Sequence, residues 1–349
     1  MINAKSLMIA MGVALAFSAS QASAQTKTLY VGLNGGTLER AYAQFVFPEF
    51  EKANNVKIVV VPGTSSEILA KAVATKDKPQ MQLMFLDDGV MYRAIELGLC
   101  AKLQASPELS QVDKLARFKD DMAVGTGMGM TGLAYNTKMF KEKGWAPPTS
   151  WMDLADPKFK DKVVFQSVSA SSFGLHAFLM FNRILGGNES NVEPAFSKFR
   201  DSIGKNVIEF IPNSSKVSEM IQTGDAGIFP LTPTLVETFK SQGLPVEYVQ
   251  PKEGSVVLMY AACVIANSGE DTLAQKLAAF ILSADSQSKM LAEANSIPAN
   301  PTAKASSPDA QTKLDAFHTY MKTALVVDWN AINAKRPDWN NRWNRIIER

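Results

Sequence analysis

Strands and helices alternate between residues 28 and 98, and this alternation limits the possible folds more than any other feature of the sequence. Short apolar runs that end in turn residues are typical of buried strands; they lie at 28–33, 56–61 and 82–86. Each run is followed by a segment predicted to be helical; these segments lie at 38–53, 64–74 and 90–97. The β-α-β-α-β order predicts a parallel sheet covered by helices.

Segments of the same kind recur after residue 160. Strands are predicted at 162–166 and 207–211, and helices at 173–185 and 215–223. The 349-residue chain exceeds the size at which a single core stops growing. The sequence therefore predicts an α/β protein with two lobes. The tail at 329–349, rich in Trp and Arg, is predicted to be a closing amphipathic helix packed on one lobe.

The first 24 residues have the three parts of an export signal. Lys5 gives a positive start, an apolar run extends from Leu7 to Phe17, and Ala22-Ser23-Ala24 matches an A-x-A cleavage site. The apolar run is too short to span a bilayer, and no cysteine follows the cleavage site to carry a lipid. We therefore predict that 1–24 is a cleaved signal peptide and that the mature protein is free in the periplasm.

The charge balance argues against nucleic acid or a membrane surface as the main partner. Lys+Arg number 36 and Asp+Glu 34, which gives a net charge of +2. With only two cysteines and two histidines, a zinc site of four cysteines is impossible, and we expect neither a metal nor a cofactor. Cys100 and Cys263 form a disulfide in an oxidising compartment or remain two separate buried thiols; the sequence leaves both possibilities open.

Motifs associated with enzymes lack the context that they need. Residues 127–132 match G-x-G-x-x-G, but the stretch before them is polar and the stretch after them is predicted to be a strand. We interpret them as a glycine-rich strand between the lobes. No G-x-S-x-G occurs. His176 is predicted to be packed in an apolar helix and His318 to be solvated, so we do not expect an enzyme.

Three strand ends supply the first candidate ligand residues, because open α/β sheets bind ligands beyond the carboxyl ends of their strands. These candidates are Asn34, Gly35, Gly36, Thr64, Ser65, Asp87 and Asp88. Adjacent residues at a strand end diverge, so one of the two aspartates is expected to point into a cleft and the other away. A carboxylate there binds an amine or caps the following helix, and the two roles are compatible.

Hydroxyl residues open one predicted helix in each lobe. They are Thr64, Ser65 and Ser66 in the first lobe and Ser169, Ser171 and Ser172 in the second. Helix N-termini present free N–H groups and a positive dipole end, so both clusters are candidate anion sites, although capping alone also explains them. No lysine or arginine falls at these turns. We expect an anion there to rely on backbone N–H groups and hydroxyls.

Four stretches of the chain resemble one known family. They are 131–137, the Ser-Trp-containing segment 148–162, the turn 224–227, and 249–254, which reads Val-Gln-Pro-Lys-Glu-Gly. On these residues the chain resembles the bacterial extracellular solute-binding proteins of the spermidine/putrescine-binding class, the periplasmic components of ABC importers.

The resemblance implies a two-lobe periplasmic binding protein fold of type II with the ligand in the inter-lobe cleft. The N-lobe is expected at 25–130 plus 262–300, and the C-lobe at 131–261 plus 301–349. The crossovers between lobes are expected near Gly132, at 256–262 and at 298–302. Lobes of this kind close on a ligand that contacts both of them.

The resemblance also implies partners and two further candidate ligand residues, Thr232 and Tyr260. The partners are a small-molecule solute and an inner-membrane ABC permease with its ATPase, and the chain is expected to be a monomer. A role as a chemoreceptor partner that binds solute without transport is compatible with the same sequence.

The chain departs from polyamine binders where they place acidic residues and tryptophan. The positions that match a Trp and an Asp of the return strand are Leu258 and Tyr260, and serines replace acidic residues at 169–172. An unpaired ammonium in a dry cleft is costly. We therefore expect a small polar solute of ω-amino acid, organic acid or aminophosphonate type; the alternative is a polyamine such as putrescine or spermidine.

Overall fold

The described chain, residues 26–348 of the computed structural model, opens with the alternation of strands and helices that the sequence predicts. The predicted signal peptide at 1–24 lies outside the described residues. The opening elements are β1 (Lys27–Leu33), α1 (Thr37–Ala41), η1 (Tyr42–Val46), α2 (Phe47–Asn54), β2 (Val56–Pro62), α3 (Ser65–Ala74), β3 (Leu83–Asp87) and α4 (Asp88–Glu96). Strands β2, β1 and β3 lie side by side and parallel.

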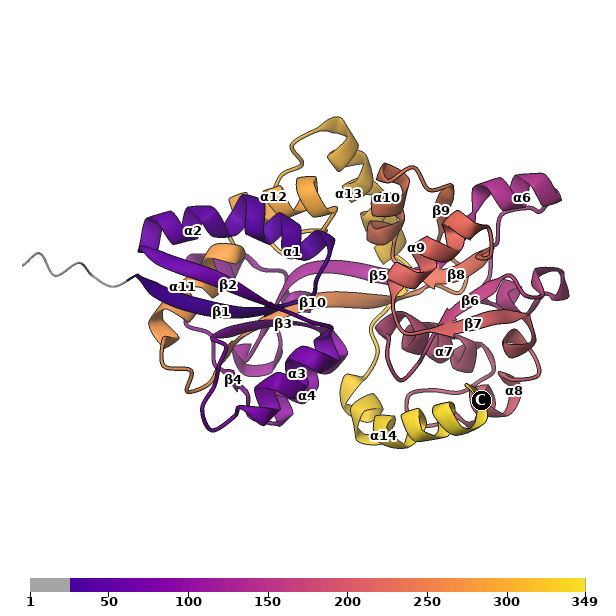
Figure 1. Ribbon diagram of the computed structural model, residues 1–349, viewed down its shortest axis with the longest axis horizontal. Helices are drawn as coiled ribbons and strands as arrows, with labels where there is room; N and C mark the ends of the chain where they lie inside the picture. Colours follow the sequence, from indigo (N-terminus) through magenta and orange to yellow (C-terminus); the bar gives the residue numbers. More distant parts are fainter. Residues whose placement is uncertain (1–25, 349) are drawn as a thin grey trace, which may run out of the picture.

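The N-lobe is the half of the molecule built around this parallel sheet, drawn in indigo in Figure 1. Its apolar core contains Leu29, Val31 and Leu33 of β1. Later segments complete it: β4 (Cys100–Ala101), α5 (Pro107–Gln111), η2 (Lys114–Ala116), η3 (Lys119–Asp121), α11 (Asp271–Ile281) and α12 (Ala284–Ala294).

The C-lobe is the other half, with a smaller sheet covered by helices (Figure 1). Its strands are β6 (Val163–Gln166), β7 (Val207–Ile211), β8 (Ile228–Leu231) and β9 (Val246–Val249). Its helices are α6 (Thr137–Lys143), η4 (Trp151–Ala155), η5 (Pro157–Phe159), α7 (Ser172–Ile184), α8 (Glu193–Lys198), η6 (Ile203–Asn206), α9 (Ser214–Thr223) and α10 (Pro233–Ser241). Phe165, Phe178 and Phe199 pack against Trp343 in its core.

Two long antiparallel strands join the lobes: β5 (Val124–Asn136) and β10 (Ser255–Ile265). Strand β5 pairs with β10 through Thr131, and from Gly132 onward it pairs with β8 and β9 of the C-lobe. The G-x-G-x-x-G stretch is therefore a strand between lobes, as predicted. Glycine is required at Gly132, because a Cβ there would collide with the ring and hydroxyl of Tyr248.

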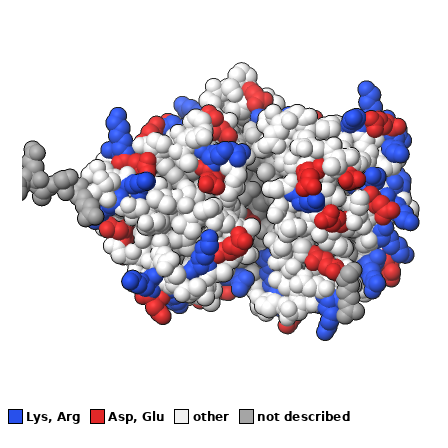
Figure 2. Space-filling view, in the orientation of Figure 1, with Lys and Arg blue, Asp and Glu red and all other residues white. Residues whose placement is uncertain are grey.

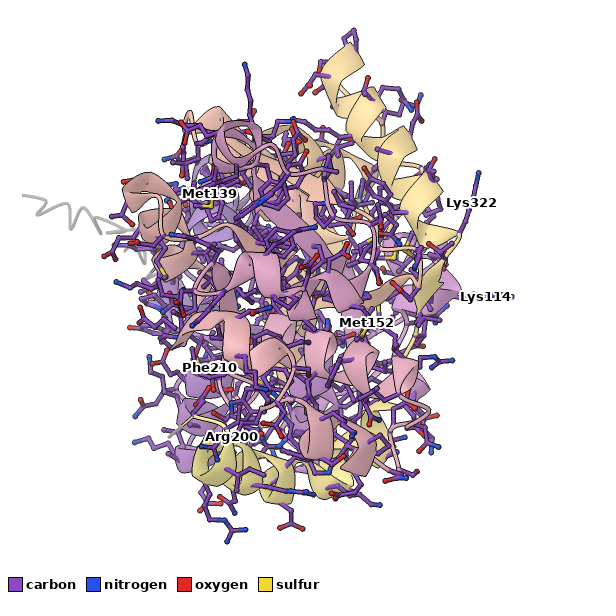
Figure 3. All side chains as sticks on the ribbon, turned by 90° about the vertical axis from the view of Figure 1, so that its right-hand side faces the viewer. Lys114, Met139, Met152, Arg200, Phe210 and Lys322 are labelled. Atoms are coloured by element: carbon purple, nitrogen blue, oxygen red, sulfur yellow. A yellow bond between two sulfur atoms is a disulfide. The ribbon has the colours of Figure 1, made fainter. Side chains whose placement is uncertain are left out.

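The C-terminal segment packs against both lobes. It forms α13 (Pro308–Met321), β11 (Ala324–Leu325) and α14 (Trp329–Ile346). Figure 3 views the C-lobe end-on and shows α13 and α14 at opposite edges, with Lys322 projecting from the end of α13. Helix α14 inserts Trp339 and Trp343 into the C-lobe core and also packs against α4 of the N-lobe. None of the helices within residues 26–348 has the length and apolar character needed to cross a membrane.

Cys100 and Cys263 form a disulfide, which resolves the question that the sequence leaves open. Their Cα atoms are 5.6 Å apart on paired strands, Cys100 in β4 and Cys263 in β10. The two cysteines are 163 residues apart in sequence, and the chain between them includes the sheet and helices of the C-lobe up to β10. The disulfide therefore joins an N-lobe segment that precedes the C-lobe in the chain to one that follows it.

Replacing both cysteines by serine is expected to lower the free energy of unfolding by about 2–5 kcal/mol, because a crosslink over a long loop restricts the unfolded chain. Urea unfolding of the wild type and of the Cys100→Ser/Cys263→Ser variant measures the difference. Dithiothreitol should destabilise the wild type and leave the variant unchanged; equal stability of the two proteins would contradict the prediction.

Candidate ligand-binding cleft

A polar cavity of about 120 Å³ lies between the lobes, in the furrow that Figure 2 shows between them. Both lobes and the C-terminal helix line it. The N-lobe contributes Asn34, Thr64, Ser65, Ser66, Asp87 and Val90; the C-lobe contributes Gln166, Ala170, Ser171, Ser172, Phe173, Pro212, Asn213 and Ser214; and α14 contributes Arg336. The strand ends predicted from sequence for both lobes therefore meet in one cavity.

The N-termini of four helices reach this cavity: α3 and α4 from the N-lobe, and α7 and α9 from the C-lobe. Thr64 caps α3 in a reciprocal pair with Glu67, Ser171 accepts from Phe173 N–H in α7, and Asn213 accepts from two N–H groups of α9. The predicted capping by hydroxyl residues is confirmed for Thr64 and Ser171. Converging helix N-termini give the cavity a positive electrostatic field.

Asp87 is the carboxylate of the cavity. It occupies the N-cap position of α4, but its side chain makes no capping bond. Instead, the hydroxyl of Ser172 donates a 2.8 Å hydrogen bond to Asp87 Oδ2 from the opposite lobe. Ser65 Oγ accepts from Asp87 N–H and is within 3.3 Å of Asn34 Nδ2. Burial raises the pKa of Asp87, and the bonds from Ser172 and Ser65 and the charge of Arg336 partly oppose this rise.

Asp88 points away from the cavity, so the predicted divergence of the two aspartates is confirmed, but Asp88 does not line the cleft as a ligand residue. It is 2% exposed and accepts from Gly89 N–H at 3.0 Å. Burial and then the neighbouring charge of Asp87 raise the pKa of Asp88 to about 8, against hydrogen bonds from Trp329, Gly89 and Met259.

Five other candidates lie away from the cavity wall: Gly35, Gly36, Ser169, Thr232 and Tyr260. Gly36 has a φ of 92° and occupies the N-cap position of α1. The hydroxyl of Ser169 contacts Ser167 at 2.9 Å. Thr232 is buried beside Gly129 of β5. Tyr260 pairs with Asp87 across β10 and β3, and it lines a second space of about 10 Å³, which Tyr42 also lines and which shares Asn34 with the cavity.

Arg336 of α14 is a cleft residue that the sequence analysis did not single out; it adds a basic side chain from a distant segment to the ends of α3 and α7, whose own turns carry no lysine or arginine. It is 7% exposed and lines the cavity. Burial and the charge of Arg93 lower its pKa to about 10, against the carboxylates of Asp87 and Asp88, so it stays protonated at neutral pH. A signal was available: Arg336 falls on the buried stripe of α14, at helical spacing from Trp329, Trp339 and Trp343.

His176 is fully buried, as predicted, and is not among the residues that line the cavity. Its Nδ1 contacts Thr131 Oγ1 at 2.8 Å, and its ring lies 5.6 Å from the ring of Trp329. Burial and the charge of Arg336 lower its pKa to about 3, so the imidazole is neutral. Among residues 26–348 no group of three or more His, Cys, Asp or Glu side chains has an arrangement that could hold a metal ion.

Comparison with known proteins identifies the family. The family model for bacterial extracellular solute-binding proteins matches residues 46–318. The chain belongs to this family.

Relatives and solved structures agree with that assignment. Spermidine/putrescine-binding periplasmic protein 1 of Haemophilus influenzae is 24% identical over 254 residues, covering 69% of this chain and 68% of the relative. A putative 2-aminoethylphosphonate-binding periplasmic protein of Salmonella typhi is 18% identical over 264 residues, covering 74% of each chain. The structure of the Atu4243-GABA receptor matches with a TM-score of 0.74 at 21% identity, over 91% of this chain and 97% of that one.

The two-lobe α/β architecture is thus the type II periplasmic binding protein fold. The protein is a periplasmic solute-binding component of an ABC transporter, and it delivers a small-molecule solute to a permease. The relatives are transport binding proteins.

The pKa of Asp88 predicts a fall in stability as the pH rises from 6.5 to 8. Asp88 keeps its proton in the folded state up to about pH 8 but loses it near 3.8 when unfolded, so the free energy of unfolding decreases by up to about 1.4 kcal/mol per pH unit. Below pH 6.5, buried neutral His176, which gains a proton on unfolding, opposes this slope.

Urea unfolding of the wild type and of Asp88→Asn at pH 6.5, 7.2 and 8.0 checks this expectation. The variant should show a flat profile over this range. An equal slope in both proteins would mean that Asp88 is already ionised in the folded state.

Proposed function

We propose that this protein captures in its cleft a small polar organic solute with at least one anionic group, of ω-amino acid, organic acid or aminophosphonate type. It hands this solute to an inner-membrane ABC permease driven by its ATPase. The protein acts as a monomer, without catalysis and without nucleic acid. The lobe boundaries expected from the sequence, 25–130 plus 262–300 and 131–261 plus 301–349, belong to the same proposal.

The observation that carries this proposal is the balance of charge in the cavity. Four helix N-termini and the guanidinium of Arg336 face a single lining carboxylate, Asp87. Helix N-termini and arginine favour anions. The cavity has room for on the order of ten water-sized groups, at about 10–15 Å³ of such space for each.

A polyamine fits this balance poorly, although some relatives bear the name of spermidine/putrescine-binding proteins. A di- or tricationic ligand needs a carboxylate near each ammonium, because an unpaired buried charge is costly. Leu258 is buried in β10, and serines occupy the start of α7. The relative named for 2-aminoethylphosphonate and the structure named for GABA support a solute with both an acidic and an amino group.

Closure of the lobes on the solute allows the permease to distinguish the loaded protein from the empty one. Ser172 of the C-lobe bonds to Asp87 of the N-lobe, so the two walls of the cleft are within hydrogen-bond reach of each other. A solute that contacts both walls favours the closed arrangement by its differential affinity.

Calorimetric titration of the purified mature protein with 4-aminobutanoate, 2-aminoethylphosphonate, succinate and putrescine tests the proposal. At least one acid-bearing compound is expected to bind, to shrink the particle in small-angle scattering, and to be recovered unchanged. Tight binding of putrescine with none of the acid-bearing compounds would overturn it in favour of the polyamine alternative.

A further inference from the structure

The side chain of Arg336 is buried without a salt bridge. It takes part in none of the carboxylate pairs found within residues 26–348. Charged arginines are rarely this buried unless they are paired. Arg342, on the same helix, shows the contrast, because it pairs with Glu193 at 2.6 Å on the surface. The guanidinium of Arg336 thus has unused capacity to bind an anion, and it faces the cavity.

Both lobes fix the backbone that carries Arg336. At the start of α14, Trp329 packs so closely on Gly89 of α4 that a Cβ at that glycine would overlap its ring. The side chain of Asn333 donates a buried 3.0 Å hydrogen bond to the carbonyl of Gly89. Beyond Arg336, Trp339 and Trp343 are anchored in the C-lobe core. Held on both sides, the helix keeps Arg336 in the cleft wall.

Among the charged and titratable groups near Arg336, only Arg336 itself and Asp87 line the cavity and can contact a ligand. His176 is neutral, and Asp88 lies outside the cavity with a pKa of about 8. Arg93 adds positive charge nearby and is not among the cavity-lining residues. Asp87, whose carboxylate reaches Ser172 of the opposite wall, is the remaining charge. A ligand in the cleft therefore meets Arg336 and Asp87 together.

We infer that Arg336 determines specificity: it binds the acidic group of a zwitterionic solute whose ammonium group pairs with Asp87, and it excludes polyamines. This inference rests on the proposed function and narrows it to ω-amino acids and aminophosphonates. Putrescine would place an ammonium beside a buried guanidinium, and a dicarboxylate would place a carboxylate beside Asp87. Like charges repel strongly where water is excluded.

The experiment compares affinities of the wild type, Arg336→Gln, Arg336→Lys and Asp87→Asn, with Arg342→Gln as a matched control on the same helix. The probes are 4-aminobutanoate, 2-aminoethylphosphonate, succinate and putrescine. Loss of one charge-assisted contact corresponds to roughly 10- to 100-fold weaker binding. We expect R336Q to lose this much for the zwitterions and to gain affinity for putrescine, and D87N to shift preference from the zwitterion toward succinate.

The outcomes separate this inference from the proposed function. If the wild type binds a zwitterion and R336Q binds it equally well, the role of Arg336 is refuted while the proposed function stands. If the wild type binds putrescine alone, both fail. R342Q should match the wild type. R336K keeps the charge, so it should still reject putrescine even if R336Q does not fold; acceptance of putrescine by R336K would overturn the inference.

Discussion

The antiparallel pairing of β5 with β10 is the constraint on which the rest of the structure depends. Both strands belong to the N-lobe sheet, and β5 continues into the C-lobe sheet after Thr131. Because β10 pairs with β5 from Val256 to Ala262, the two strands form one hydrogen-bonded connection. A change in the angle between the lobes must therefore bend or twist these strands, as in hinged domain closure. The disulfide between Cys100 and Cys263 fastens the N-lobe end of this connection.

The chemistry of the cleft follows from that arrangement. In a parallel β-α unit the helix begins at the carboxyl end of its strand, so α3 and α4 of one lobe and α7 and α9 of the other start at the cleft. Polar capping side chains and free backbone N–H groups therefore lie at the cleft, and they supply positive potential there without basic side chains. Against this background, Asp87 and Arg336 are the two side chains that give the cavity its charge pattern.

Two of the segments that carry the family resemblance contact each other, and none of the four lines the cavity. The indole N–H of Trp151 donates to the carbonyl of Gly254 at 2.8 Å, and the hydroxyl of Ser150 donates to Glu253 at 2.6 Å. The Ser-Trp segment and the Pro-Lys-Glu-Gly segment are thus partners in one structural contact.

The sequence by itself determined what depends on near neighbours in the chain: the strand-helix order, the caps at Thr64 and Ser171, and the opposite directions of Asp87 and Asp88. Periodicity and capping are local, so they can be read before the chain folds. Only the tertiary structure decided which strand-end residues reach the cavity and that Arg336 joins them. That residue is placed by contacts such as Asn333 with Gly89, 244 residues apart, and no local pattern encodes which surfaces such distant segments will share.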